Sequence, residues 1–143
     1  MEKWDQVLRE IETLTRKLDT RFSEFNGSET KTPPPINRKS YNHIGKSLSL
    51  GADSLSLLAL SQPTKYDCSD AIFQGDPSFE RIQTLTKKAC IDLLAATKTV
   101  AKQPERGLII KTPSKMVSAQ QLVKLILLHV DTHLKEIKDE QFP

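Results

Sequence analysis

Hydrophobic residues recur at steps of three and four along most of the chain. The pattern is clear over residues 3–25, where charged side chains occupy the opposite face. The apolar face carries Trp4, Val7, Leu8, Ile11, Leu14, Leu18, Phe22 and Phe25. This spacing predicts a helix with one buried stripe. We expect it to end at Asn26-Gly27, which has the chemistry of a left-handed C-terminal cap.

Three further segments have the same period, and they predict helices over about 37–61, 77–103 and 118–139. The second helix carries small residues at Ser47, Gly51 and Ser54, which permit the close approach of a neighbour. Asp76 before Pro77 predicts an N-cap followed by proline at the first helical position. Residues 104–115 are expected to be irregular, with 107–111 as a short extended piece.

These elements predict an all-α protein, a four-helix bundle formed by a single domain over residues 1–143. The linkers of about 10 to 15 residues are long for connections between helices. We therefore expect at least one of them to cross over the bundle instead of forming a tight turn.

Composition narrows the classes of function. The net charge is +3, from 21 basic and 18 acidic residues spread along the chain, so no basic stripe indicates nucleic-acid binding. No apolar run reaches the roughly eighteen residues that a membrane span needs. The N-terminal segment has neither the apolar core of a secretory signal nor the composition of a transit peptide. Cys68 and Cys90 are far apart, and we interpret them as free thiols in a reducing cytoplasm.

The chain has three histidines, and two of them, His129 and His133, lie four residues apart. They fall on the apolar face of the last predicted helix, where β-carbons at this spacing are about 5–6 Å apart. Two imidazoles so placed can bind one ion, with bonds of about 2.0–2.1 Å for zinc. A third ligand is needed, and His43 supplies it if the second and fourth helices are neighbours. Three neutral imidazoles would leave the ion Lewis-acidic, with open positions for water or substrate.

Other interpretations of these residues stay open. A buried histidine is commonly a core or capping residue, and a pair at this spacing also arises by chance. Asp131 and Glu136 are expected on the wrong face of the last helix to act as a general base. The two cysteines show no activating surroundings in the sequence. No catalytic or cofactor-binding residue is therefore assigned.

Two segments resemble a known family. The first is YNHIGKSL, residues 41–48, and the second is GLIIKTPSKMVSAQQLVKLILLHVDTHLKEI, residues 107–137. Their motifs, His43-Ile44 and the pattern H-x-x-x-H-L-x-x-I from His129 to Ile137, resemble those of the DinB/YfiT-like superfamily of four-helix bundles. The tryptophan-serine pair that often opens the second helix of that family is replaced here by INRKSYN.

The resemblance implies up-down-down-up connectivity and a metal triad of His43, His129 and His133. It also implies zinc or nickel as the ion, a homodimer, and in some relatives a low-molecular-weight thiol such as bacillithiol, mycothiol or glutathione. The leading hypothesis is a metal-dependent enzyme of thiol-transferase or hydrolase type that acts on a small molecule.

The alternative hypothesis is a non-catalytic, dimeric metal-binding or interaction bundle. A cleft beside the histidines would favour the enzyme, and a filled core would favour the alternative. For a homodimer, the helices expected over 3–25 and 118–139 are the preferred interface.

Overall fold

Within the described part of the chain, four helices form the protein, as the sequence predicts. A computed structural model describes residues 2–26, 33–62, 64–103, 109–111 and 115–137. The helices are α1 (Glu2–Asn26), α2 (Pro35–Ala59), α3 (Phe79–Ala101) and α4 (Ala119–Glu136). Two short strands, β1 (Ile109–Lys111) and β2 (Met116–Ser118), precede α4. The all-α prediction is confirmed.

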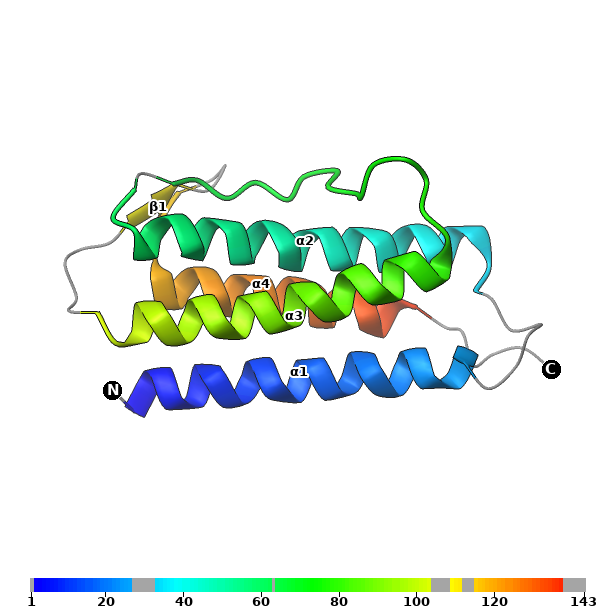
Figure 1. Ribbon diagram of the computed structural model, residues 1–143, viewed down its shortest axis with the longest axis horizontal. Helices are drawn as coiled ribbons and strands as arrows, with labels where there is room; N and C mark the ends of the chain where they lie inside the picture. Colours follow the sequence, from blue (N-terminus) through cyan, green and yellow to red (C-terminus); the bar gives the residue numbers. More distant parts are fainter. Residues whose placement is uncertain (1, 27–32, 63, 104–108, 112–114, 138–143) are drawn as a thin grey trace.

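The helices pack as a bundle in which α2 contacts α3 and α4, and α1 contacts the same two helices. In Figure 1 the chain runs left to right along α1, back along α2, and again right to left along α3. It returns left to right along α4. Because α2 and α3 run the same way, the linker 60–78 passes back along the length of α2 (Figure 1). We call the described residues of this linker, 60–62 and 64–78, the crossover.

Several helix ends differ from those expected. The second helix begins at Pro35 with Pro34 as the N-cap residue, because a proline in the first turn removes no intrahelical hydrogen bond. The predicted N-cap at Asp76 is wrong. Ser78 caps α3 instead, its Oγ accepting a hydrogen bond from the Arg81 amide at 3.1 Å. The expected cap at Gly27 lies outside the described residues.

A hairpin leads directly into α4. Strand β1 falls within the extended piece expected over 107–111, and it pairs antiparallel with β2, with Ile110 opposite Val117. Ser118 ends β2 and caps α4 through a capping box with Gln121, which satisfies donors at both residues. The helix stops at Glu136, three residues earlier than predicted, because Ile137 is extended.

Aromatic residues pack together at one end of the core. The cluster contains Phe22, Phe25, Tyr41 and Phe79, from α1, α2 and α3, with ring centroids 5.0 to 6.2 Å apart. Edge-to-face and tilted pairs of this kind stabilise beyond the area they bury. Tyr41 precedes His43 by two residues, so this cluster makes the turn of α2 that carries His43 rigid.

Two hydrogen bonds fasten the crossover to α2. Ser54 donates to the Lys65 carbonyl at 3.0 Å, and Tyr66 donates to the Ser47 carbonyl at 3.1 Å. Burial above all raises the pKa of the Tyr66 hydroxyl well above its ordinary value, so this donor stays protonated. The Ser54 side chain therefore faces the crossover instead of a neighbouring helix, and the Ser47 backbone carbonyl binds it as well.

Gly51 allows α2 to pack closely against α4, as the small residues of this helix predict. A β-carbon there would lie 2.5 Å from Cδ1 of the fully buried Ile126 on α4. The absence of a side chain at Gly51 therefore lets α2 and α4 approach, and these are the helices that carry the three histidines.

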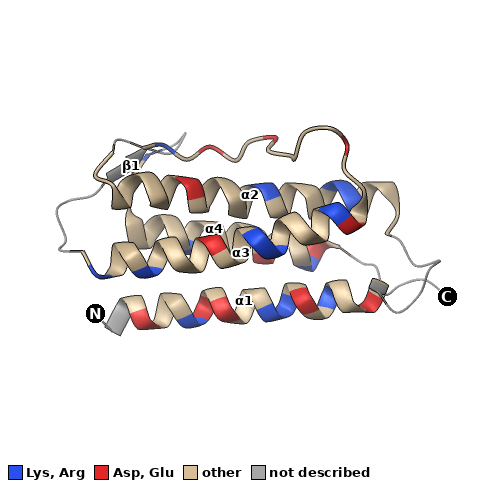
Figure 2. Ribbon diagram, viewed as in Figure 1, with Lys and Arg blue, Asp and Glu red and all other residues tan. Residues whose placement is uncertain are grey.

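The outer surface is charged with both signs. Figure 2 shows acidic and basic residues alternating along α1. Of the helices in the described part of the chain, none has both the length and the apolar character needed to cross a bilayer.

Candidate metal centre

The structure brings the three histidines together. His43 from α2 meets His129 and His133 from α4, and one ring nitrogen from each lies within 4.8 Å of the other two. The ring centroids are 5.0 Å apart for both His43 pairs and 4.4 Å apart for the α4 pair. All three side chains are half-buried. The predicted convergence of α2 and α4 at one end of the bundle is therefore present.

A backbone carbonyl of the crossover sets the tautomer of His43. Its Nδ1 lies 2.8 Å from the Ala71 carbonyl oxygen, which can only accept a hydrogen bond, so Nδ1 carries the proton. In the neutral ring, Nε2 then presents its lone pair to the other histidines. A carbonyl that orients a histidine through its second nitrogen is a common outer-shell feature of metal sites.

His129 lies at the centre of the cluster. Its Nε2 is 3.0 Å from Nε2 of His43. Because the His43 nitrogen carries a lone pair, either a proton on His129 or a shared cation must lie between the two atoms. Burial, followed by the charges of His133 and His43, lowers the pKa of His129 below its ordinary value. A neutral imidazole, the form that binds a metal, is therefore favoured at neutral pH.

His133 lies at the exposed end of α4. Its Nδ1 is 3.7 Å from Oε2 of Glu136, one turn further along the helix. Glu136 thus reaches towards the site, contrary to the expectation that it lies on the wrong face. This separation is longer than a hydrogen bond and the Glu136 side chain is 67% exposed, so the carboxylate is a neighbour of the ring that does not fix its orientation.

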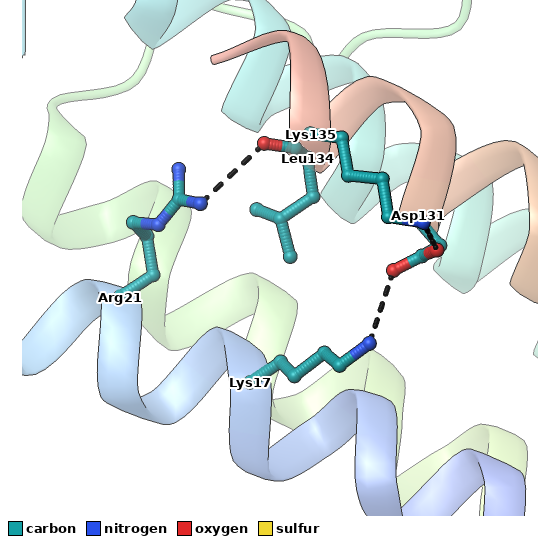
Figure 3. A network of polar contacts seen from close by, with 5 residues as sticks. All are labelled: Lys17, Arg21, Asp131, Leu134 and Lys135. Atoms are coloured by element: carbon teal, nitrogen blue, oxygen red, sulfur yellow. Dashed lines mark hydrogen bonds and ion pairs between the residues drawn. The ribbon is translucent and has the colours of Figure 1, made fainter. Parts of the chain in front are cut away.

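Contacts with α1 fix the rotation of α4. Figure 3 shows Lys17 and Arg21 of α1 reaching the last turns of α4. Lys17 Nζ lies 3.3 Å from Asp131, which also pairs with Lys135 at 3.0 Å. The Arg21 guanidinium donates to the carbonyl oxygens of Leu134 and Ile137 at the C-terminal end of α4. The Leu134 carbonyl also accepts from the Ile137 amide, so Arg21 adds a second donor there. Asp131 therefore points away from the histidines, as expected.

A pocket of about 640 Å³ adjoins the cluster. Its walls include His43 and His129, the crossover residues 68–70 and 72–76, and Lys39 and Asn42 of α2. Asn42 accepts a hydrogen bond from the Phe73 amide at 2.6 Å, which fastens the crossover where it covers the pocket. His133 is not among the residues that line it. The volume falls within the range of about 300–1,000 Å³ typical of small-molecule sites.

Cys68 is a member of the site that the sequence did not indicate. Its Sγ lies 3.8 Å from Nε2 of His129, and it lines the pocket. The two residues are 61 positions apart, and no local pattern predicts where the crossover lies over α2. Cys90, the other free cysteine, is buried in the core.

The donor set fits a divalent transition metal. Bonds of about 2.0–2.1 Å in a tetrahedral site place two nitrogens about 3.3–3.4 Å apart. The 3.0 Å between the His43 and His129 nitrogens is close to that spacing, and the remaining separations within 4.8 Å need only small side-chain rotations. Imidazole nitrogen suits zinc and nickel better than magnesium or calcium, which prefer oxygen.

Comparisons with models of known families, with curated proteins and with solved structures find no match to this chain. The function has to be argued from the three-histidine group and the pocket beside it.

Proposed function

We propose that this bundle binds one divalent transition-metal ion through His43, His129 and His133, and that the adjoining pocket admits a small molecule. The observation that carries the proposal is the approach of three ring nitrogens from two helices. The Ala71 carbonyl supports it, because it leaves the His43 lone pair directed into the group.

The pocket supports an enzyme over a purely structural bundle. A filled core around the histidines would favour a structural role, whereas a cavity of about 640 Å³ lies beside His43 and His129. A bound divalent ion supplies Lewis acidity to an oxygen or sulfur atom of a small ligand. The protein would orient the His43 imidazole through the Ala71 carbonyl.

The finer assignment is a DinB/YfiT-like enzyme of thiol-transferase or hydrolase type, with zinc or nickel as the ion. The histidine motifs support it, and so do the directions of the four helices in Figure 1, which are those of up-down-down-up connectivity. A low-molecular-weight thiol as co-substrate is part of this proposal and rests on the resemblance. No residue is assigned as the general acid or base.

Elemental analysis of the untagged protein tests the metal site. We expect about one equivalent of zinc or nickel after incubation and desalting, and loss of that equivalent in His43→Ala and His129→Ala. Asp131→Asn is the matched control, because Asp131 lies between the two α4 histidines but pairs with Lys17 and Lys135. It should retain the ion. Unchanged metal content in His129→Ala, or no uptake by the parent, would overturn the proposal.

We also infer a homodimer in the cytoplasm, which follows from the resemblance and the free thiols. Leu125 and Leu128 of α4 are 38% and 64% exposed, and α4 is one of the two helices expected at the interface. Sedimentation equilibrium of the parent beside Leu128→Glu tests the assembly. A monomeric parent would contradict the homodimer, and a variant as dimeric as the parent would contradict an interface that contains Leu128.

A further inference from the structure

The crossover holds Cys68 at the edge of the histidine cluster. The three histidine nitrogens form the compact group, and the Cys68 sulfur contacts it through His129 Nε2 at 3.8 Å. The same nitrogen lies 3.0 Å from His43 Nε2. The Cys68 sulfur and the His43 ring nitrogen therefore both approach His129 Nε2, which is one of the three candidate metal ligands.

The backbone on both sides of Cys68 is fastened. Tyr66 is tied to α2 by its hydroxyl, and the Ala71 carbonyl is tied to the same helix by His43. Between these anchors, the Asp67 carboxylate accepts from the Ser69 amide at 2.9 Å, and the Cys68 carbonyl accepts from the Ala71 amide at 3.1 Å. The position of the Cys68 β-carbon is thus set by the same segment that orients His43.

The distance suits a shared ion. A tetrahedral zinc site with bonds of about 2.3 Å to sulfur and 2.0–2.1 Å to nitrogen places those two donors about 3.5–3.6 Å apart. The observed 3.8 Å between Cys68 and His129 is close to that value. Cys68 lies outside the group of atoms within 4.8 Å of one another, so coordination requires its side chain to rotate towards the other histidines. Cys90 offers a contrast within the same chain, because it is 4% exposed and its thiol contacts Thr15 in the core.

We propose that Cys68 is a fourth ligand of the ion held by His43, His129 and His133. This inference rests on the metal site proposed above. When the metal–sulfur bond forms, the thiol proton leaves to solvent. A sulfur donor beside three imidazoles selects zinc or cobalt over magnesium, calcium or manganese, which prefer oxygen ligands. Coordination would also fasten the crossover to α4, and a small molecule in the pocket would compete with Cys68 for the ion.

Cobalt(II) reports the ligand type directly. Reduced, untagged apoprotein is titrated with Co²⁺ in the absence of oxygen, in the parent and in Cys68→Ser and Cys90→Ser. The parent should show visible d–d bands together with the near-ultraviolet charge-transfer band of a cobalt–thiolate bond. Cys68→Ser should lose the near-ultraviolet band, keep the visible bands, and bind zinc at least about tenfold more weakly. Cys90→Ser, the matched control, should keep both sets of bands.

The outcomes separate the two proposals. Visible bands without the near-ultraviolet band in the parent would overturn the role of Cys68 and leave the histidine site standing. Persistence of that band in Cys68→Ser, or its loss in Cys90→Ser, would also overturn it. No cobalt spectrum in the parent would overturn the metal site itself.

A second measurement needs no variant and therefore decides the case if Cys68→Ser fails to fold. Zinc should slow alkylation of Cys68 in the parent by at least about tenfold, as read by peptide mass spectrometry. Equal rates with zinc and with chelator would overturn the proposal.

Discussion

Gly51→Ala tests whether the approach of α2 to α4 depends on a missing side chain. The new β-carbon would lie 2.5 Å from Cδ1 of Ile126, whereas carbon atoms pack best at about 3.5–4.0 Å. Ile126 is fully buried, so relief requires a strained rotamer or a shift of the helices. Overpacking of this kind costs about 1–3 kcal/mol, and alanine regains about 1 kcal/mol of helix propensity. The net expectation is a loss of about 0–2 kcal/mol in the free energy of unfolding.

Ile126→Val isolates the cause, because it removes the Cδ1 atom and leaves the next contact at 3.4 Å. Alone it should cost about 0.5–1.5 kcal/mol. In this background Gly51→Ala should become neutral or stabilising by up to about 1 kcal/mol. The double-mutant cycle therefore predicts a coupling of about 1–3 kcal/mol.

The assay is urea unfolding of the four proteins, followed by far-ultraviolet circular dichroism with chelator present so that no metal contributes. Gly75→Ala is the control, because Gly75 has φ +86° and open space around it. That variant should lose about 1–2 kcal/mol through backbone strain, equally with Ile126 or Val at position 126. If Gly51→Ala costs the same in both backgrounds, the packing explanation is refuted.

Other predictions address the cap, the thiols, the crossover and the ion. Ser118→Ala should lose about 0.5–2 kcal/mol in urea unfolding because α4 loses its N-cap, and an unchanged midpoint would contradict this. Burial raises the pKa of Cys90 to about 11, so alkylation of the native apoprotein near neutral pH should label Cys68 alone; early labelling of Cys90 in peptide mass spectra would be contrary evidence. Tyr66→Phe should cost about 0.5–1.5 kcal/mol in the same urea assay, and a fully stable variant would argue against the anchor to Ser47. Zinc at about 100 times its Kd should stabilise the parent by about 2.7 kcal/mol in thermal unfolding, and equal stabilisation of His43→Ala would count against the site.

The helices and the inward face of α4 were predictable because both are local properties. The step of four from His129 to His133 places both rings on the face of the buried Ile126, whatever the rest of the chain does. To predict that His43 joins this pair, we had to assume that α2 and α4 are neighbours. The structure confirms that the two helices are in contact.

The crossover was the part that local patterns could not place. Its proximity to α2 depends on tertiary contacts, so the roles of Ser47 and Ser54 as its neighbours were missed. The N-cap of α3 was assigned to Asp76 for a related reason. Asp76 has φ +47°, outside the extended conformation that an N-cap residue adopts, whereas Ser78 is extended and caps the helix. Cys68 was overlooked because the path of the crossover alone brings it to His129.

The meeting of α2 and α4 at the three histidines has a consequence for the order in which the bundle assembles. His43 and His129 are 86 residues apart, so their meeting closes a long loop, and we expect it to follow the more local pairing of α2 with α3. During synthesis, α2, the crossover and α3 emerge before α4, and they carry one of the three histidines. A complete site therefore forms only when the last helix docks. Metal occupancy would then measure tertiary assembly itself, and an ion once bound would slow the opening of α4 that hydrogen exchange detects.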